Sequence, residues 1–317
     1  MKKFVFVLVF VITFLIVFFL SDFYVFRQEA IEYINAGNSY IVKKYVQFIT
    51  RDTSPEAYRK NIIFPPSDCI NPVQHRESKE GSVLLFGGSF TFGHQIPKEK
   101  TLHRVLAKYC SRPIYDRSYS GYSVNQMLYQ LQDEDFYKIV PEPEYIIYTY
   151  IPDHIRRLYQ PCMFSIPQYY GAHYSMKKDK NGNYYFKHRK YPLFYDRFNF
   201  VARIIDIKPF DIANDYSRLF LKQHFIEAKK AVDKHWKNVK FIILVYYDDD
   251  TFYFEQIQED LEKIGYIVIE RNDLVPFKDK DIRYSLNEND GHPNDKAWDA
   301  IVPKLIEYLK KNYGYTL

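Results

Sequence analysis

Short apolar runs alternate with longer amphipathic segments over most of the chain, and this alternation predicts the fold. The run Val83–Phe86, stopped by Gly87 and Gly88, is typical of a buried strand that ends at a sharp turn. The segments between such runs are long enough for helices and carry apolar residues at helical spacing. Strands separated by helices favour parallel pairing with right-handed crossovers, hence an α/β fold with three α/β/α layers and a parallel five-stranded sheet.

The same pattern places the individual elements. Strands are expected at 83–86, near Ile114, and at 145–151, 241–246 and 266–269. Helices are expected at 101–110, 124–139, 253–264 and 296–312, and Pro303 can kink the last of them. A tyrosine-rich insertion at about 161–193 contains Asn181-Gly182, which predicts a β-hairpin. Because the insertion follows the third strand, it is expected either to overhang the carboxyl end of the sheet as a substrate-binding wall or to be a plain surface hairpin.

The first 80 residues differ from this pattern. Lys2 and Lys3 precede an apolar run at 4–20 that only Thr13 interrupts, so residues 1–22 are predicted to be an uncleaved membrane anchor rather than a removed signal peptide. The lysines would remain in the cytoplasm, which places the rest of the chain outside an inner or plasma membrane as a single-pass protein. Residues 23–80 are expected to form a juxtamembrane helix and a proline-rich connector, and the α/β domain is expected at 81–317.

Composition narrows the function classes. The net charge is only +5 in 317 residues and the cationic residues are scattered, which argues against a nucleic-acid partner. The three cysteines, Cys69, Cys110 and Cys162, allow at most one intramolecular disulfide, and their spacing does not indicate a metal site. The sequence therefore predicts no cofactor and no metal.

Two short segments carry candidate chemistry. Ser89 stands just after the first predicted strand, where a hydroxyl can face a substrate, although a Gly-Ser turn after a core strand is equally common. About two hundred residues later, Asp290 and His292 lie in a Gly/Pro/Asn-rich segment that is expected to be a loop before the last helix. An imidazole beside a carboxylate is the arrangement of a general base and the group that orients it. Ser89, His292 and Asp290 are therefore predicted to form a catalytic triad.

These segments resemble the SGNH (GDSL-type) hydrolases in three blocks that occur in family order. The stretch 87–93 (GGSFTFG) is similar to the first block, with Gly88 in place of the usual aspartate. The stretch 118–123 (SYSGYS) is similar to the second block, and 290–294 (DGHPN) to the last. The resemblance implies a flavodoxin-like sheet, Ser89 as nucleophile, and an oxyanion hole formed by the backbone N–H groups of Ser89 and Gly121.

One block departs from the family. After the third strand the family has an asparagine whose amide donates to the oxyanion, and here Pro152 falls at that position, followed by Asp153. Asn125 and His154 are the candidates to replace the missing donor. Asp153, Arg156 and Arg157 are expected to contact substrate, although salt bridges are an equally good interpretation of the two arginines.

The sequence thus predicts an extracytoplasmic serine esterase or O-acyltransferase that acts on ester groups, such as O-acetyl, of an envelope carbohydrate or a small ester. The alternative is a catalytically silent glycan-binding or assembly protein on the same fold, which the missing asparagine favours. A third hypothesis is a metal-dependent phosphoesterase using Asp153, Asp248 and Asp290.

Overall fold

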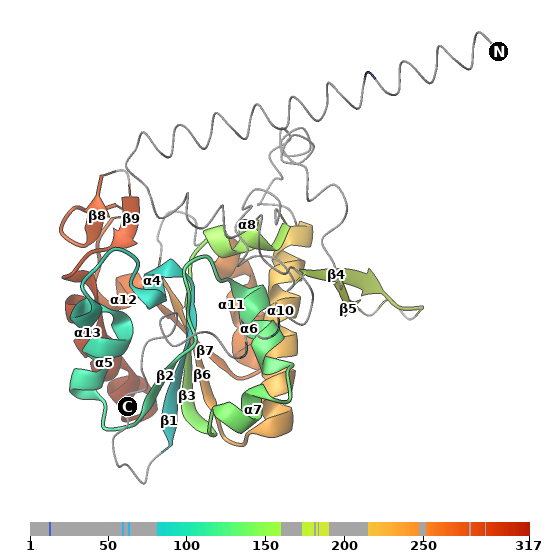
Figure 1. Cartoon of the computed structure of the whole chain (residues 1–317), viewed down its shortest axis with the longest axis horizontal. Coiled ribbons are helices and arrows are strands. Elements are labelled where there is room, and N and C mark those ends of the chain that lie inside the picture. Colours follow the sequence, from blue (N-terminus) through green and yellow to red (C-terminus); the bar gives the residue numbers. More distant parts are fainter. Residues whose placement is uncertain are drawn as a thin grey trace.

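The computed structural model describes residues 81–159, 173–180, 182, 184–189, 215–246, 252–278, 280–288 and 290–317, together with Thr13, Arg59 and Ile63. Most of these residues form an α/β domain built on a parallel sheet with helices on both sides (Figure 1). The sheet has the strand order β2-β1-β3-β6-β7, and every neighbouring pair in it is parallel. Its strands are β1 (Ser82–Gly87), β2 (Ile114–Asp116), β3 (Pro143–Tyr150), β6 (Lys240–Val245) and β7 (Tyr266–Glu270).

The strand order reverses between β1 and β3. From β1 the chain continues to β2 at one edge of the sheet, and from β3 it continues to β6 and β7 toward the other edge. This is the order of flavodoxin-like sheets, and ligands of such sheets bind at the carboxyl ends of the strands where the order reverses. The five predicted strands and their parallel pairing are confirmed to within one or two residues at each end.

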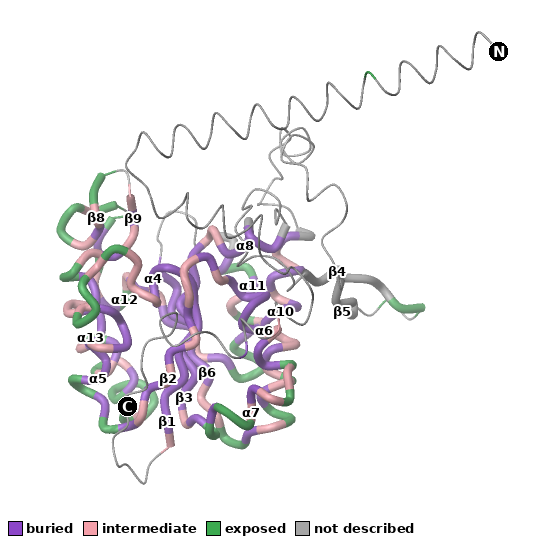
Figure 2. The backbone as a smooth tube through the Cα atoms, in the orientation of Figure 1, coloured by how far each residue is buried: buried purple, intermediate pink, exposed green. Residues whose placement is uncertain are grey.

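Two buried clusters cover the two faces of the sheet, as expected for strands with large apolar residues at successive positions (Figure 2). On one face Leu84 and Phe86 pack with the helices α6 (Val124–Leu131), α7 (Phe136–Ile139), α8 (Asp153–Tyr159), α10 (Asp215–His235) and α11 (Phe252–Lys263). On the other face Val83 and Leu85 pack with α4 (Ser89–Phe92), α5 (Leu102–Tyr109), α12 (Arg271–Leu274) and α13 (Ala297–Tyr313). The three-layer prediction is therefore confirmed.

Some sequence predictions need correction. The helix expected over 124–139 is two helices, because the chain leaves helical geometry after Leu131 and the Asp133 carboxylate accepts the backbone N–H of Asp135 in the turn between them. The segment with Asp290 and His292 is not a loop: β9 (Asp290–Pro293) pairs antiparallel with β8 (Ser285–Asn287). The Asn294 side chain supports this hairpin by donating to the carbonyls of Arg283 and Ser285. A short 3₁₀ helix at Lys98–Lys100 completes the described elements before α5.

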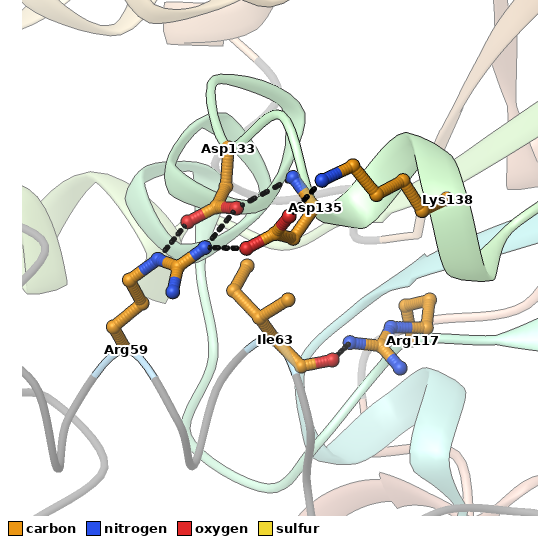
Figure 3. A network of polar contacts seen from close by, with 6 residues as sticks. All are labelled: Arg59, Ile63, Arg117, Asp133, Asp135 and Lys138. Atoms are coloured by element: carbon orange, nitrogen blue, oxygen red, sulfur yellow. Dashed lines mark hydrogen bonds and ion pairs between the residues drawn. The ribbon is translucent and has the colours of Figure 1, made fainter.

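Two described residues of the segment before the domain pack against it (Figure 3). Arg59 binds the Asp133 carboxylate through Nε at 2.5 Å and Nη2 at 2.8 Å, and Nη2 also donates to Asp135. Ile63 is completely buried in the same cluster as α6 and α7, and its carbonyl accepts a 2.8 Å hydrogen bond from Arg117. Part of the predicted connector therefore contributes to the core of the domain, and both of these residues are helical.

The predicted hairpin around Asn181-Gly182 is confirmed as β4 (His173–Lys178) paired with β5 (Tyr184–Arg189). In Figure 1 it projects outward beyond α10, on the side of the sheet away from α4. The rest of the insertion, the predicted anchor apart from Thr13, and the cysteines Cys69 and Cys162 lie outside the described residues. Among the helices that are described, none is long and apolar enough to cross a bilayer.

Candidate active site

Ser89 lies at the first turn after β1, and two glycines make that turn. Gly87 has φ +153°, and a side chain there would place Cβ only 2.1 Å from the Thr91 hydroxyl. The chain then enters the short helix α4 at Ser89, so the serine follows directly from the central strand. Ser89 is 6% exposed and stands beside the point where the strand order reverses. The local sequence therefore delivers a hydroxyl to the end of the sheet where ligands of this fold bind.

The hydroxyl of Ser89 contacts the imidazole of His292, which is 203 residues further along the chain. Ser89 Oγ lies 2.7 Å from His292 Nε2, a hydrogen-bonding distance. The ring of Phe90 packs against the imidazole with the centroids 4.7 Å apart, which restricts its rotation. An imidazole in this position can accept the proton of the serine hydroxyl.

Asp290 binds the opposite nitrogen of the same imidazole. Its Oδ1 lies 2.5 Å from His292 Nδ1 and also accepts the backbone N–H of His292 at 3.0 Å. Partial burial raises the pKa of the Asp290 carboxyl, but the two hydrogen bonds from His292 outweigh it and the pKa is lowered. The carboxylate therefore stays ionised, fixes the tautomer with the proton on Nδ1 and leaves Nε2 to accept a proton from Ser89. The three predicted triad residues thus lie together in the order that acid–base chemistry requires.

The loop that carries Gly121 runs against the end of β1. The Ser118 N–H donates to Asp116 Oδ1 at 2.9 Å, and the Tyr119 N–H donates to the Gly87 carbonyl at 3.3 Å. Gly121 has φ +88°, a conformation that L-residues rarely adopt, so a glycine is needed there for the loop to turn. The loop is therefore held beside the turn that presents Ser89.

The residues after β3 mostly contact other parts of the protein. Arg157 is 9% exposed; its Nη2 binds Asp153 Oδ2 at 2.7 Å and its Nη1 donates to the Tyr122 carbonyl at 2.9 Å. The pair of Asp153 and Arg157 therefore connects α8 to the loop of Gly121, and the predicted contact of these residues with substrate stays a prediction. The side chain of Arg156 lies outside the described part of the structure.

The two candidates for the missing amide donor lie in different surroundings. Asn125 is 4% exposed, and its Oδ1 accepts a 2.9 Å hydrogen bond from the Ser123 hydroxyl at the start of α6. His154 is 1% exposed, and its Nδ1 lies 2.7 Å from the hydroxyl of Tyr148 on β3. Its Nε2 points toward Gly88, since a Cβ built on Gly88 would lie 3.0 Å from that nitrogen.

Sequence reasoning missed two residues of this neighbourhood. Tyr148 read only as a core position of a strand, although its spacing of six from His154 across the strand–helix turn allows the pair to meet. His94, five residues after Ser89, is the second, although His292 and not His94 is the histidine at Ser89 Oγ. Even so, the His94 Nδ1 lies 3.2 Å from the Ser120 hydroxyl, and its ring centroid is 5.9 Å from that of His292. His94 also contributes to lowering the pKa of Asp290, after burial and the hydrogen bonds from His292.

A metal site is not evident among the described residues. No group of three or more His, Cys, Asp or Glu side chains in the described ranges is placed to hold a metal ion. Of the residues named for a metal-dependent phosphoesterase, Asp153 binds Arg157, Asp290 binds His292, and Asp248 lies outside the description.

The sequence matches no family model and no curated protein. Solved structures with a similar arrangement include an acetyl xylan esterase from the rumen bacterium Butyrivibrio proteoclasticus, at 11% identity and a TM-score of 0.44. That alignment covers 76% of this chain and 66%, just under two thirds, of the esterase. A member of the lipolytic G-D-S-L family from Veillonella parvula matches at 12% identity and a TM-score of 0.43, over 73% of this chain and 98% of that one. A family two carbohydrate esterase from Clostridium thermocellum, solved with cellohexaose, matches at 10% identity and a TM-score of 0.43, over 74% of this chain and 65% of that one.

Proposed function

We propose that the protein is a serine esterase or O-acyltransferase that acts on ester groups, such as O-acetyl, of an envelope carbohydrate. The observation that carries the proposal is the contact between Ser89 Oγ and His292 Nε2 at 2.7 Å, with Asp290 on the other imidazole nitrogen. Three side chains from the two ends of the domain meet there in the geometry of a nucleophile, a base and an orienting carboxylate.

The proposed reaction begins when Ser89 Oγ attacks the carbonyl carbon of an ester. A C–O bond forms, the hydroxyl proton passes to His292 Nε2, and the carbonyl π pair becomes a lone pair on an oxyanion. Collapse of this intermediate expels the alcohol, which takes the proton from His292 and leaves an acyl group on Ser89. Water then releases the acyl group as a carboxylic acid, or a sugar hydroxyl accepts it as a new ester. His292 is the base in that second step as well.

The location and the carbohydrate substrate belong to the proposal too. The apolar run at 4–20 supports a single-pass anchor with the domain on the extracytoplasmic side of an inner or plasma membrane. A domain held on that side would meet envelope glycans, and their O-acetyl esters are the bonds that a serine nucleophile can cleave.

The test uses the full chain in detergent or membranes with p-nitrophenyl acetate as substrate. Ser89→Ala and His292→Ala are each expected to lower kcat by roughly 10⁴-fold or more, since removing either member of such a triad disables the other. His235→Gln is the matched control, because that imidazole stacks on Tyr137 at the far side of the domain and should leave kcat unchanged.

A fluorophosphonate probe separates the enzymatic proposal from its main alternative. We expect covalent labelling of wild type at Ser89 and none of Ser89→Ala. Binding of an acetylated glycan without labelling of a well-folded wild type would instead assign the protein to the silent glycan-binding class. Wild-type turnover that persists in Ser89→Ala would remove the serine from the mechanism.

A further inference from the structure

His154 presents an unpartnered polar atom next to the proposed nucleophile. The residue is the second of α8, the helix that follows β3, and it is 1% exposed. Its Nε2 is buried and has no hydrogen-bond partner among the described residues. The neighbour of that nitrogen is Gly88, the residue before Ser89. Buried polar atoms are rarely left unsatisfied in folded proteins, and those that are often serve a ligand or a reaction intermediate.

The partner of the other imidazole nitrogen decides which nitrogen carries the proton. The Tyr148 hydroxyl lies 2.7 Å from His154 Nδ1, and burial raises the pKa of this phenol well above its ordinary value, so it keeps its proton. If the phenol donates to Nδ1, the ring proton sits on Nε2. The reverse arrangement would leave both the phenol proton and the Nε2 lone pair buried without partners, two unsatisfied groups instead of one. The pair therefore favours an N–H at Nε2.

The charges around His154 keep the ring neutral. Burial is the main cause that holds the pKa of the His154 imidazole well below its ordinary value, and the positive charge of Arg157 lowers it further. The phenols of Tyr148 and Tyr150 also pack against the ring, and the carboxylate of Asp153 is bound by Arg157. A histidine that cannot take up a second proton cannot act as a base, but its N–H remains available as a hydrogen-bond donor.

We infer that the Nε2–H of His154 is the side-chain donor of the oxyanion hole, with Tyr148 as the positioning residue that holds the proton on that nitrogen. The inference rests on the proposed serine mechanism and assigns the donor that the asparagine supplies in the family that the sequence resembles. Pro152 stands where that asparagine belongs, and His154 follows two residues later on the same turn.

Distances allow the Ser89 amide and His154 to share one oxygen. The Ser89 nitrogen lies about 2.7 Å from a Cβ on Gly88, and that Cβ would be 3.0 Å from His154 Nε2. At most about 5.7 Å therefore separates the two nitrogens, and two donors that each lie about 2.9 Å from one oxygen can be up to about 5.8 Å apart.

Lack of space explains why position 88 is a glycine. Its φ of −94° is negative, so no left-handed conformation demands a glycine here. A Cβ there would lie 2.9 Å from the Tyr122 carbonyl and 3.0 Å from both Arg157 Nη1 and His154 Nε2. The aspartate usual in the family at this position would occupy the volume next to the His154 ring. The exchange of aspartate for Gly88 and the presence of His154 thus fit together.

The main test compares His154→Leu, which removes the donor at similar volume, with His154→Gln, whose amide can reach the Nε2 position. On p-nitrophenyl acetate, His154→Leu is expected to lower kcat about 100- to 1,000-fold with little change in KM, the usual loss for one oxyanion donor. His154→Gln should recover at least tenfold of that loss. Tyr148→Phe, which leaves the imidazole in place without its partner, should lower kcat about 3- to 30-fold. Thermal melting and circular dichroism identify the variants that fold.

A spectroscopic readout tests the tautomer apart from turnover. In ¹⁵N-histidine-labelled wild type, the His154 ring should show a proton on Nε2 and none on Nδ1, with no titration between about pH 5 and 8, a range in which an ordinary histidine titrates. Tyr148→Phe should show both tautomers. A wild-type ring protonated on Nδ1 would overturn the inference.

The outcomes distinguish this inference from the proposed function. If Ser89→Ala is inactive but folded His154→Leu keeps kcat within threefold of wild type, the serine mechanism stands and His154 is not the donor. A large loss in Asn125→Leu in that case would assign the donor to Asn125. Turnover that survives in Ser89→Ala would instead overturn the proposed function itself, whatever the histidine variants do.

Discussion

His292 contacts Ser89 and His154 lies beside Gly88, and the two histidines differ in exposure, in hydrogen-bond partner and in the charge nearby. His292 has 28% of its side-chain surface exposed and donates from Nδ1 to the Asp290 carboxylate. His154 is 1% exposed, contacts the Tyr148 phenol and lies near the guanidinium of Arg157. One ring is arranged to take up a proton beside a negative charge, whereas the other is prevented from doing so by burial and a positive charge.

The difference shows that residue type alone does not assign a catalytic role. A carboxylate partner stabilises an imidazolium, so His292 can receive the serine proton in the step that forms the oxyanion. A neutral ring with its N–H fixed can instead donate to that oxyanion without competing for the proton. The two roles are compatible because the Asp290 carboxylate lets His292 carry a positive charge, whereas burial and the positive charge of Arg157 keep His154 neutral.

The largest loss of kcat is expected when the carboxylate of Asp290, which His154 has no counterpart for, is removed from His292. In Asp290→Asn the amide can no longer stabilise an imidazolium and can hold the ring in the wrong tautomer, so kcat is expected to fall about 10³- to 10⁴-fold. The measurement is kcat on p-nitrophenyl acetate at neutral pH, with Asp281→Asn, which removes an acid bound to Arg283, as the matched control. A loss smaller than tenfold would show that His292 does not depend on the carboxylate.

The same variant tests the pH dependence of stability. The pKa of Asp290 is lowered in the folded protein, so its carboxylate stabilises the fold above the ordinary carboxyl pKa of about 3.9 and loses this effect as the pH falls through the lower folded value. The Tm difference between wild type and Asp290→Asn should therefore be largest at neutral pH and shrink on acidification below about pH 4. A difference that stays constant down to pH 3 would contradict the lowered pKa.

Much of this arrangement could be predicted from local patterns. Apolar runs and glycines place the strands and the turn at Ser89, because a buried strand and a sharp turn each leave a direct trace in the sequence. The parallel order then brings the end of β1 and the end of β3 together, which is why Ser89 and the segment of Asp153 and His154 could be expected at one edge.

What could not be predicted depends on side-chain packing. Nothing in the pattern Tyr148–Tyr150 shows which tyrosine hydroxyl bonds His154, and the motif that ends at Pro152 leaves Asn125 and His154 as equal candidates for the missing donor. The break between α6 and α7 is likewise tied to a distant partner, since Arg59 binds the aspartates in that turn. Contacts between residues that are remote in sequence leave no local periodicity from which they could be inferred.

A smaller loss of kcat is expected when a substitution beside His154 displaces its ring. Gly88→Ala puts a methyl group 3.0 Å from His154 Nε2 and 2.9 Å from the Tyr122 carbonyl, so the ring or the loop must shift. We expect a 10- to 100-fold loss of kcat and a loss of about 1–3 kcal/mol in the free energy of unfolding, as for other overpacked sites. Gly81→Ala is the matched control, because its Cβ would lie 2.9 Å from Glu144 Cβ at the other end of β1. If both alanines reduced kcat equally, the effect would reflect strain in β1 and not the position of His154.

The smallest effect on activity should come from Arg59, which contacts neither histidine. Arg59→Ala removes the contacts to Asp133 and Asp135, but 40% of the arginine side chain is exposed, so solvent already weakens the pair. We expect a fall in Tm of about 1–4 °C, equivalent to at most about 1 kcal/mol, with kcat within twofold of wild type. Lys230→Ala, which breaks an exposed pair with Glu227 on α10, is the control and should change Tm less, because that lysine contacts its own helix while Arg59 joins two distant segments. A fall in kcat larger than the change in stability would show that the segment before the domain influences the turn at Ser89. The route would run through Ile63 and Arg117, whose backbone N–H donates to Leu85 on β1.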